Sequence, residues 1–149
     1  MELESRNELE NKNKLQSNEE TLIVIKPDGF KRGITGKIIS RFEDKGFQIK
    51  KIKSFQFEKM EAEEFYNIHR DKPFFNELVS FITSGMVVAC IIEGNNAVAT
   101  TRLMIGSTKS SEAGAGTVRG DFGLGLTDNI IHASDSAESF IKESKVIFG

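Results

Sequence analysis

Short apolar runs alternate along this chain with segments of helical periodicity, and this order limits the possible folds more than any other feature. Four runs have the length and composition of β-strands: Thr21–Lys26, Phe47–Phe57, Met86–Ile92 and Asn129–His132. The second changes phase between Ile49 and Ile52, which indicates a bulge or a strong twist. The sequence Pro-Asp-Gly at 27–29 predicts a turn after the first. The resulting order, β-α-β-α-β-α-β, predicts an α+β sandwich of ferredoxin-like type, in which helices cover a four-stranded antiparallel sheet.

Spacing and end signals define the helices in the first half of the chain. Ile34, Ile38 and Phe42 recur every fourth residue, and a glycine follows the segment, which together predict a capped helix. Residues 60–84 should be helical in two pieces, because Pro73 disfavours helical geometry at the residue before it.

The second half should continue with a helix, a long loop and a last helix. Residues 95–105 fit a helix, whereas residues 106–126 contain six glycines and little periodicity, which predicts a loop of the kind that is usually functional. Asp135 or Ser136 can cap the last helix. The inner face of that helix is predicted to carry Ala137, Phe140, Ile141 and Ser144.

Length and composition indicate one domain in a reducing compartment. Residues 1–20 are polar with few apolar side chains, so we expect a flexible N-terminal extension followed by one domain over residues 21–149. A single cysteine, Cys90, excludes a disulfide framework. The sequence has neither an apolar run near the roughly 20 residues that span a bilayer nor the core of a signal peptide, so we expect a cytoplasmic protein.

The charge balance argues against nucleic acid and membranes as partners. Twenty basic and 22 acidic residues leave a net charge of −2, so the chain has no strong overall field. Four-stranded sheets of this type can bind RNA, but through a basic face and exposed aromatic residues on a central strand. The run Met86–Ile92 contains no aromatic residue. Any phosphate binding must therefore be local.

His132 is the strongest candidate for chemistry in the sequence. It ends a predicted strand directly before a helix start, where free backbone N–H groups and the helix dipole favour a phosphate. A neutral imidazole is also a nucleophile. Glu143 lies seven residues after Ser136 on the same helical face and could reach one ring nitrogen. On position alone a structural role for His132 is still the stronger interpretation, and His69, the other histidine, is predicted to be a surface helix residue.

Four cations could neutralise phosphate groups: Lys26, Lys72, Arg102 and Arg119. Lys26 ends a buried strand, where an ammonium group is costly unless it emerges at a site. Arg119 lies among glycines that let the backbone approach an anion, and its guanidinium could grip phosphate with two N–H groups. The sequence contains neither a phosphate-binding loop motif nor a complete dinucleotide-binding motif. Any nucleotide binding must therefore use another design.

Four motifs together resemble the nucleoside diphosphate kinase family over nearly all of residues 21–148. They are Ile25-Lys26-Pro27-Asp28-Gly29, the segment Tyr66–Phe75, Gly116-Thr117-Val118-Arg119-Gly120-Asp121-Phe122, and Asn129-Ile130-Ile131-His132-Ala133-Ser134-Asp135-Ser136. The last motif is the most specific, and all four stand in the order and spacing of the family. The match makes His132 the expected nucleophile.

The resemblance implies an enzyme that transfers the γ-phosphoryl group of a nucleoside triphosphate, typically ATP, to a nucleoside diphosphate. In its ping-pong cycle His132 would carry the phosphoryl group, Glu143 would orient the imidazole, and Ser134 would support Glu143. The positions implied to hold phosphates and sugar are Lys26, Tyr66, Lys72, Arg102, Thr108, Arg119 and Asn129. The residues that resemble an apolar clamp on the base are Phe74, Leu78 and Leu126. Mg²⁺ is implied to arrive on the nucleotide phosphates without a direct protein ligand, with Asp135 able to reach it through water.

The family also implies a homo-oligomer built from dimers, either a tetramer or a hexamer. Lys109-Ser110 and Ala115 stand where the family usually has Asn-Pro and a further proline, so this loop should be less rigid. The main alternative is a non-catalytic relative that binds nucleotides for regulation. Such a protein would be expected to lack the histidine, lysine or arginine of the site, whereas this chain retains all of them.

Overall fold

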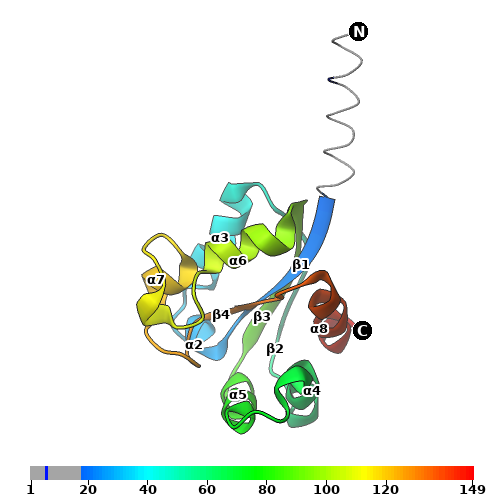
Figure 1. Ribbon diagram of the computed structural model, residues 1–149, viewed down its shortest axis with the longest axis vertical. Helices are drawn as coiled ribbons and strands as arrows, with labels where there is room; N and C mark the ends of the chain where they lie inside the picture. The colour runs from blue at the N-terminus through cyan, green and yellow to red at the C-terminus, as the bar shows by residue number, and fades with distance from the viewer. Residues whose placement is uncertain (1–5, 7–17) are drawn as a thin grey trace.

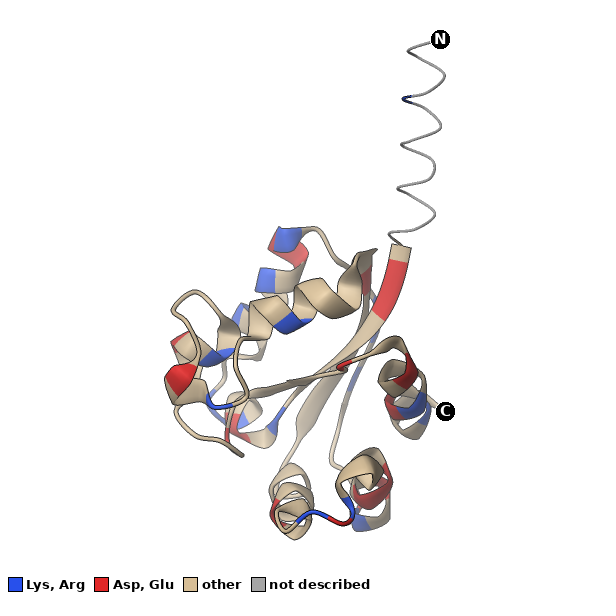
Figure 2. Cartoon of the chain, in the orientation of Figure 1, with Lys and Arg blue, Asp and Glu red and all other residues tan. Residues whose placement is uncertain are grey.

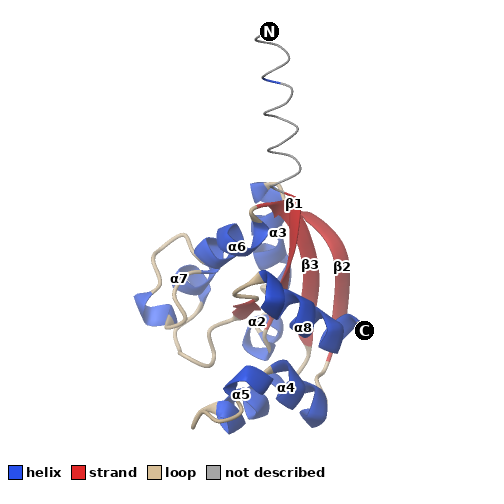
Figure 3. Cartoon of the chain, turned by 45° about the vertical axis from the view of Figure 1, so that its right-hand side comes forward, coloured by secondary structure: helices blue, strands red, loops and turns tan. Residues whose placement is uncertain are grey.

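A four-stranded antiparallel sheet lies at the centre of the protein, with helices on both of its faces (Figures 1 and 3). The computed structural model describes residue 6 and residues 18–149. The strands lie in the order β2-β3-β1-β4 and comprise β1 (Asn18–Ile25), β2 (Gln48–Phe55), β3 (Val87–Asn95) and β4 (Ile131–Ala133). The predicted ferredoxin-like α+β fold is confirmed.

The helices connect these strands and form the outer layers. They are α2 (Pro27–Lys31), α3 (Thr35–Lys45), α4 (Lys59–Phe65), α5 (Phe75–Ile82), α6 (Ala97–Ile105), α7 (Val118–Phe122) and α8 (Ala137–Phe148), with 3-10 turns η1 (Asn67–His69) and η2 (Ser110–Glu112). Basic and acidic residues are mixed on α3, α4 and α8 (Figure 2), in line with the small net charge. Within residue 6 and residues 18–149, no helix is long and apolar enough to cross a membrane.

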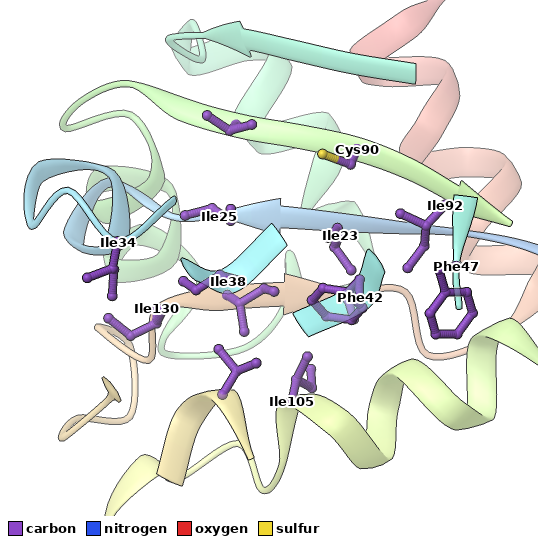
Figure 4. Close-up of a cluster of buried hydrophobic side chains, with 14 of the residues drawn as sticks. Ile23, Ile25, Ile34, Ile38, Phe42, Phe47, Cys90, Ile92, Ile105 and Ile130 are labelled. Atoms are coloured by element: carbon purple, nitrogen blue, oxygen red, sulfur yellow. The ribbon is translucent and has the colours of Figure 1, made fainter. Parts of the chain in front are cut away.

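The sheet is buried on both faces, which explains why β1 reads as a continuous apolar run. Ile23 and Ile25 point into a core shared with α3, α6 and α7 (Figure 4). Leu22 and Val24 point to the other side, into a core shared with α4, α5 and α8. β1 is one of the two inner strands of the sheet. It pairs with β3 on one side and with β4 on the other, so Val24 lies opposite His132. The sheet thus places His132 on an edge strand beside a fully buried neighbour.

Two strand boundaries differ from the prediction. β1 begins at Asn18, paired with Asn95, so residues 18–20 belong to the sheet rather than to the polar extension. The rest of the predicted extension lies outside the described residues, apart from residue 6. β4 begins two residues later than predicted, at Ile131, because Ile130 has a φ of 75° and cannot continue a strand. The predicted bulge in β2 is confirmed by a register shift between Ile49 and Lys51.

Several connecting segments are more regular or differently oriented than predicted. Residues 27–31 form the short helix α2 instead of a turn, with proline in its first turn. The segment 106–126 contains η2 and α7 within its loop. Ser136 caps α8 by accepting a hydrogen bond from the Ser139 backbone. The predicted inner stripe is right for Phe140, which packs against the core, but wrong for Ile141, which is 65% exposed, and it omits the buried Ile147. The helix instead turns Glu143 and Ile147 inward.

Candidate active site

A cavity of about 570 Å³ opens where the end of β1, β4, α5, α8 and the loop before Asn129 come together. Its volume lies within the range of about 300–1,000 Å³ that is usual for small-molecule sites. The residues of the predicted site that line it are Lys26, Tyr66, Phe74, Leu78, Arg102, Thr108, Arg119, Leu126, Asn129, His132, Asp135 and Glu143. The fold therefore gathers residues that lie more than 100 positions apart in the sequence.

His132 is held by a carboxylate on one ring nitrogen. Its Nε2 lies 2.7 Å from Glu143 Oε1, and Ser134 Oγ donates to the same oxygen at 2.8 Å. The His132 ring also packs edge-on against Phe65 and Tyr66, at centroid distances of 4.9 and 6.3 Å. If Nε2 carries the proton that Glu143 accepts, Nδ1 keeps its lone pair. This arrangement suits a nucleophile with a fixed ring orientation.

Two arginines bracket His132 through the backbone of β4. Arg119 donates to the carbonyls of Gly106 and Ile131, at 3.1 and 2.8 Å, and Arg102 donates to the carbonyl of Ala133 at 3.1 Å. Arg119 is only 4% exposed, and its Nε is buried without a partner among the described residues. Burial and the nearby Arg102 charge lower the pKa of Arg119 to about 10. Part of its predicted grip on phosphate is thus already used to anchor β4.

Lys26 brings a second buried cation to the same cavity. It is 4% exposed, and its Nζ donates to Asn129 Oδ1 at 2.8 Å and to the Thr127 carbonyl at 3.1 Å. Burial, followed by repulsion from Arg119, lowers the pKa of Lys26 to about 8. Neither partner of the ammonium group is charged. An anionic ligand in the cavity would therefore meet an ammonium group whose hydrogen-bond partners are both neutral.

Asn129 and Asp135 are oriented by neighbouring polar groups. The Asn129 amide accepts from Lys26 and donates to the Thr108 carbonyl at 2.8 Å, so it links the two sides of the cavity. Asp135 accepts from Ser139 Oγ at 2.6 Å, and this hydrogen bond is the main reason that the Asp135 pKa is lowered. Asp135 is consequently a carboxylate at neutral pH.

An apolar wall closes the outer end of the cavity. Phe74, Leu78 and Leu126 line it, and Phe74 and Leu126 remain 44% and 61% exposed. The His69 ring packs against Phe74 with a centroid distance of 5.6 Å and lines the same cavity. His69 lies in the 3-10 helix η1 and is half-buried, as a surface helix residue can be, but the sequence did not indicate that it would line the cavity.

Two predicted site residues do not line the cavity. Ser134 is fully buried and contacts the site through its hydrogen bond to Glu143, and Lys72 lies on the exposed turn before α5. Sequence reasoning missed several residues that do line it, which are Ile68, His69, Glu77, Thr127, Asp128, Ala133 and Ser139. Proximity to the motifs could have suggested Ile68, Thr127 and Asp128. Nothing in the local sequence marks Glu77, which accepts a hydrogen bond from Thr127 Oγ1 at 3.0 Å.

Fold and site together define a class. An oriented imidazole, two buried cations and an apolar wall around one cavity are the components of a phosphotransferase that acts on nucleotides, because phosphoryl transfer needs mainly alignment and charge stabilisation.

Comparison with known proteins places the chain within that class. The family model described as nucleoside diphosphate kinase matches residues 19–149. A nucleoside diphosphate kinase of Picrophilus torridus is 52% identical over 130 residues, which cover 87% of this chain and 94% of that protein. The Aquifex aeolicus enzyme structure superimposes with a TM-score of 0.87 at 47% identity, covering 89% and 96% of the two chains. A Halobacterium salinarum nucleoside diphosphate kinase, solved in complex with CDP, gives a TM-score of 0.85 at 41% identity and covers 88% of both chains.

The chain belongs to the nucleoside diphosphate kinase family. It is an enzyme that transfers a phosphoryl group from a nucleoside triphosphate to a nucleoside diphosphate.

Proposed function

We propose that this transfer runs through a phosphohistidine on His132 in a ping-pong cycle. His132 Nδ1 attacks the γ-phosphorus, the bond to the β-phosphate oxygen breaks, and the nucleoside diphosphate leaves with that oxygen. A second diphosphate then attacks the phosphorus through its terminal oxygen, the N–P bond breaks, and free His132 returns. The observation that carries this proposal is the 2.7 Å contact of Nε2 with Glu143, which leaves Nδ1 as the nucleophilic nitrogen.

Initial-rate kinetics test the cycle. If the donor product leaves before the acceptor binds, double-reciprocal plots at several fixed acceptor concentrations should be parallel. Lines that intersect would instead require both nucleotides to be bound at once, and would contradict the proposed cycle.

The buried cations support charge stabilisation during transfer. Lys26 and Arg119 lie in the cavity with little exposure to water, where their field on developing negative charge is strongest. Arg102 lines the same cavity and donates to the Ala133 carbonyl of β4. We propose that these three groups hold the phosphates, while Tyr66, Thr108 and Asn129 contact phosphate or sugar. Lys72 would make a single contact from the rim.

The apolar wall supports broad base specificity. The Halobacterium salinarum relative binds CDP, and a nucleotide in the present cavity would place its base beside Phe74, Leu78 and Leu126. Stacking on such a surface discriminates little between bases, because each base has a similar π-face.

We propose that Mg²⁺ enters as part of the nucleotide substrate. Within the described ranges, no group of three or more His, Cys, Asp or Glu side chains could hold a metal ion. The carboxylate of Asp135 at the cavity wall suits a contact through water. When bound, Mg²⁺ neutralises charge on the phosphate oxygens.

We also propose that the enzyme is a cytoplasmic homo-oligomer, a dimer-based tetramer or hexamer. The open sheet edge β2 supports self-association, because its Ile52 side chain is 59% exposed.

Replacing Glu143 with alanine should lower kcat by about 10- to 100-fold, the value of one hydrogen bond to a charged group. The effect should fall on kcat rather than on KM, because Glu143 contacts the imidazole. Initial rates at saturating nucleotide measure it. Glu138→Ala is the matched control, since Glu138 is an exposed residue of α8 that forms an ion pair with Lys142 and does not line the cavity. An unchanged kcat in Glu143→Ala would contradict the proposed orienting role.

The kcat/KM of the enzyme should fall as the pH rises above about 8. A Lys26 pKa of about 8 means that the free enzyme loses this cation there, and neutral lysine cannot balance phosphate charge. Bound nucleotide should raise the Lys26 pKa, so kcat should fall only at higher pH than kcat/KM does. Lys26→Arg does not titrate in this range and should lack this limb of the profile, whereas a profile unchanged by Lys26→Arg would contradict the assignment.

The pH dependence of stability should have the opposite sign. Lys26 has a lower pKa in the folded protein, about 8, than its usual value of 10.5. Between these values the unfolded chain binds more protons, so this residue makes the free energy of unfolding rise with pH. Above pH 8, kcat/KM should therefore fall while the Lys26 contribution to the free energy of unfolding rises.

A further inference from the structure

Ile130, between two residues of the site, has a strained backbone. Its φ of 75° is unfavourable for a β-branched side chain, and Ile131 N donates to Asn129 O at 2.9 Å across it. A hydrogen bond between residues i and i+2 around a central residue with positive φ defines a γ-turn of the rare, strained type. Asn129 precedes this turn, and His132 follows two residues after Ile130. Any relaxation of the turn would therefore displace both side chains.

The strained residue is held by the segment that follows β1. Asp28 Oδ2 accepts a hydrogen bond from Ile130 N at 3.0 Å, and Lys26 N donates to Ile130 O at 2.8 Å. Both backbone polar groups of Ile130 are thus bound by residues more than 100 positions away. Gly29 permits the close approach, since a Cβ there would lie 2.9 Å from Ile25 Cγ2 and 3.3 Å from Ile130 O.

The Asp28 carboxylate lies in an unfavourable environment. Its Oδ1 is buried and has no hydrogen-bond partner among the described residues. Burial raises the pKa of Asp28, although the backbone N–H groups of Ile130 and Gly29 and the charge of Lys26 oppose that effect. Asp28 does not line the cavity. A buried acidic group that is incompletely satisfied, and that contacts one strained amide, calls for an explanation beyond packing.

We propose that Asp28 is a positioning residue for phosphoryl transfer, which keeps the Ile130 turn in its strained form and thereby fixes Asn129 and His132 relative to the buried cations. It acts entirely through the backbone of Ile130. Without its hydrogen bond the turn can relax toward negative φ, because the Ile130 N–H would lose its partner and, of the hydrogen bonds to the segment after β1, that from the Lys26 amide to Ile130 O would remain. Small displacements of a nucleophile lower the rate strongly.

Asp28→Ala and Asp28→Asn give the first test. Alanine removes the acceptor, and kcat should fall by about 10- to 100-fold, whereas asparagine keeps an oxygen for Ile130 N and should retain kcat within about threefold. Asp44→Ala, at an exposed position of α3, should leave kcat unchanged. A folded Asp28→Ala enzyme with wild-type kcat would overturn the proposal, as would equal losses in the alanine and asparagine variants.

A double-mutant cycle separates positioning from a general loss of stability. Glycine adopts positive φ without strain, so Ile130→Gly removes the need for the Asp28 hydrogen bond. Asp28→Ala should then lower kcat less than about threefold in the Ile130→Gly background, at a temperature where circular dichroism shows all four proteins folded. Effects on kcat that multiply would mean that Asp28 acts independently of the turn, and the proposal would fail.

This inference rests on the proposed site but can fail separately from it. The readout is kcat for overall transfer, which does not require a phosphohistidine. If wild-type protein forms the phosphohistidine but the two substitutions of the double-mutant cycle have multiplicative effects on kcat, only the role proposed for Asp28 is wrong. If wild-type protein transfers phosphate without a phosphohistidine, the proposed mechanism is wrong, whatever the double-mutant cycle shows.

Discussion

His132→Ala is expected to lower kcat for phosphoryl transfer by about 10⁴-fold or more, because the variant lacks the nucleophile of both half-reactions. The fold should survive, since His132 is on an edge strand and its side chain remains 20% exposed. A coupled assay of nucleoside diphosphate formation from the donor measures the loss of activity.

His69→Ala is the informative comparison for this variant. His69 lines the same cavity and is the only other histidine in the chain, but its ring lies against Phe74. Its loss should change kcat/KM by less than about tenfold, the scale of one aromatic contact. If His132→Ala kept activity within about tenfold of wild type, His132 could not be the nucleophile.

Lys26→Met should lower kcat/KM by about 10²- to 10³-fold, the usual loss when one fixed group that stabilises transition-state charge is removed. Methionine approximates the lysine stem without the ammonium group, so Asn129 Oδ1 loses its 2.8 Å donor as well. The same initial-rate assay applies. Lys37→Met, at an exposed position of α3, is the control and should behave like wild type.

Lys26→Met should not lose stability in proportion to its loss of activity. The lowered pKa of Lys26 shows that burial disfavours its charged form in the folded protein. The substitution removes that penalty but also removes the donor to two acceptors, Asn129 Oδ1 and the Thr127 carbonyl. These effects oppose each other, so the unfolding midpoint in urea should change little at neutral pH. A large loss of stability together with near-normal kcat/KM would show that Lys26 is structural rather than functional.

Local sequence determined much of the fold. The period of Ile34, Ile38 and Phe42 predicted α3, and the final glycine does cap it with a φ of 110°. Continuous apolar runs predicted β1 and β3, because both faces of the sheet are buried. These elements depend mainly on the side chains within them, so their own residues carry the signal.

The misplaced elements depend on contacts that a local pattern does not contain. β4 begins only at Ile131 because Ile130 has a positive φ, and the backbone of Ile130 is hydrogen-bonded to Asp28 and Lys26, which come from another part of the chain. The α8 stripe was wrong at Ile141 because Ile141 and Ile147 are equally apolar, and only packing against the rest of the fold decides which is buried.

The residues of the site show the same difference between what local sequence predicts and what depends on contacts between distant segments. Helical spacing predicted that Glu143 could reach His132, and the two lie 2.7 Å apart. Family motifs, not local chemistry, distinguished His132 from an ordinary strand end. No pattern indicated that Glu77 or His69 would line the cavity, because α5 and η1 reach it only in the folded chain.

The most direct test of the mechanism is to trap the phosphorylated enzyme. Wild-type protein is incubated with Mg²⁺ and a γ-labelled nucleoside triphosphate, freed of nucleotide, and then mixed with an unrelated nucleoside diphosphate. We predict an acid-labile label that is absent in His132→Ala, retained in His69→Ala, and transferred to the added diphosphate. Transfer between nucleotides without any enzyme-bound label, or a label that persists in His132→Ala, would contradict a mechanism through His132.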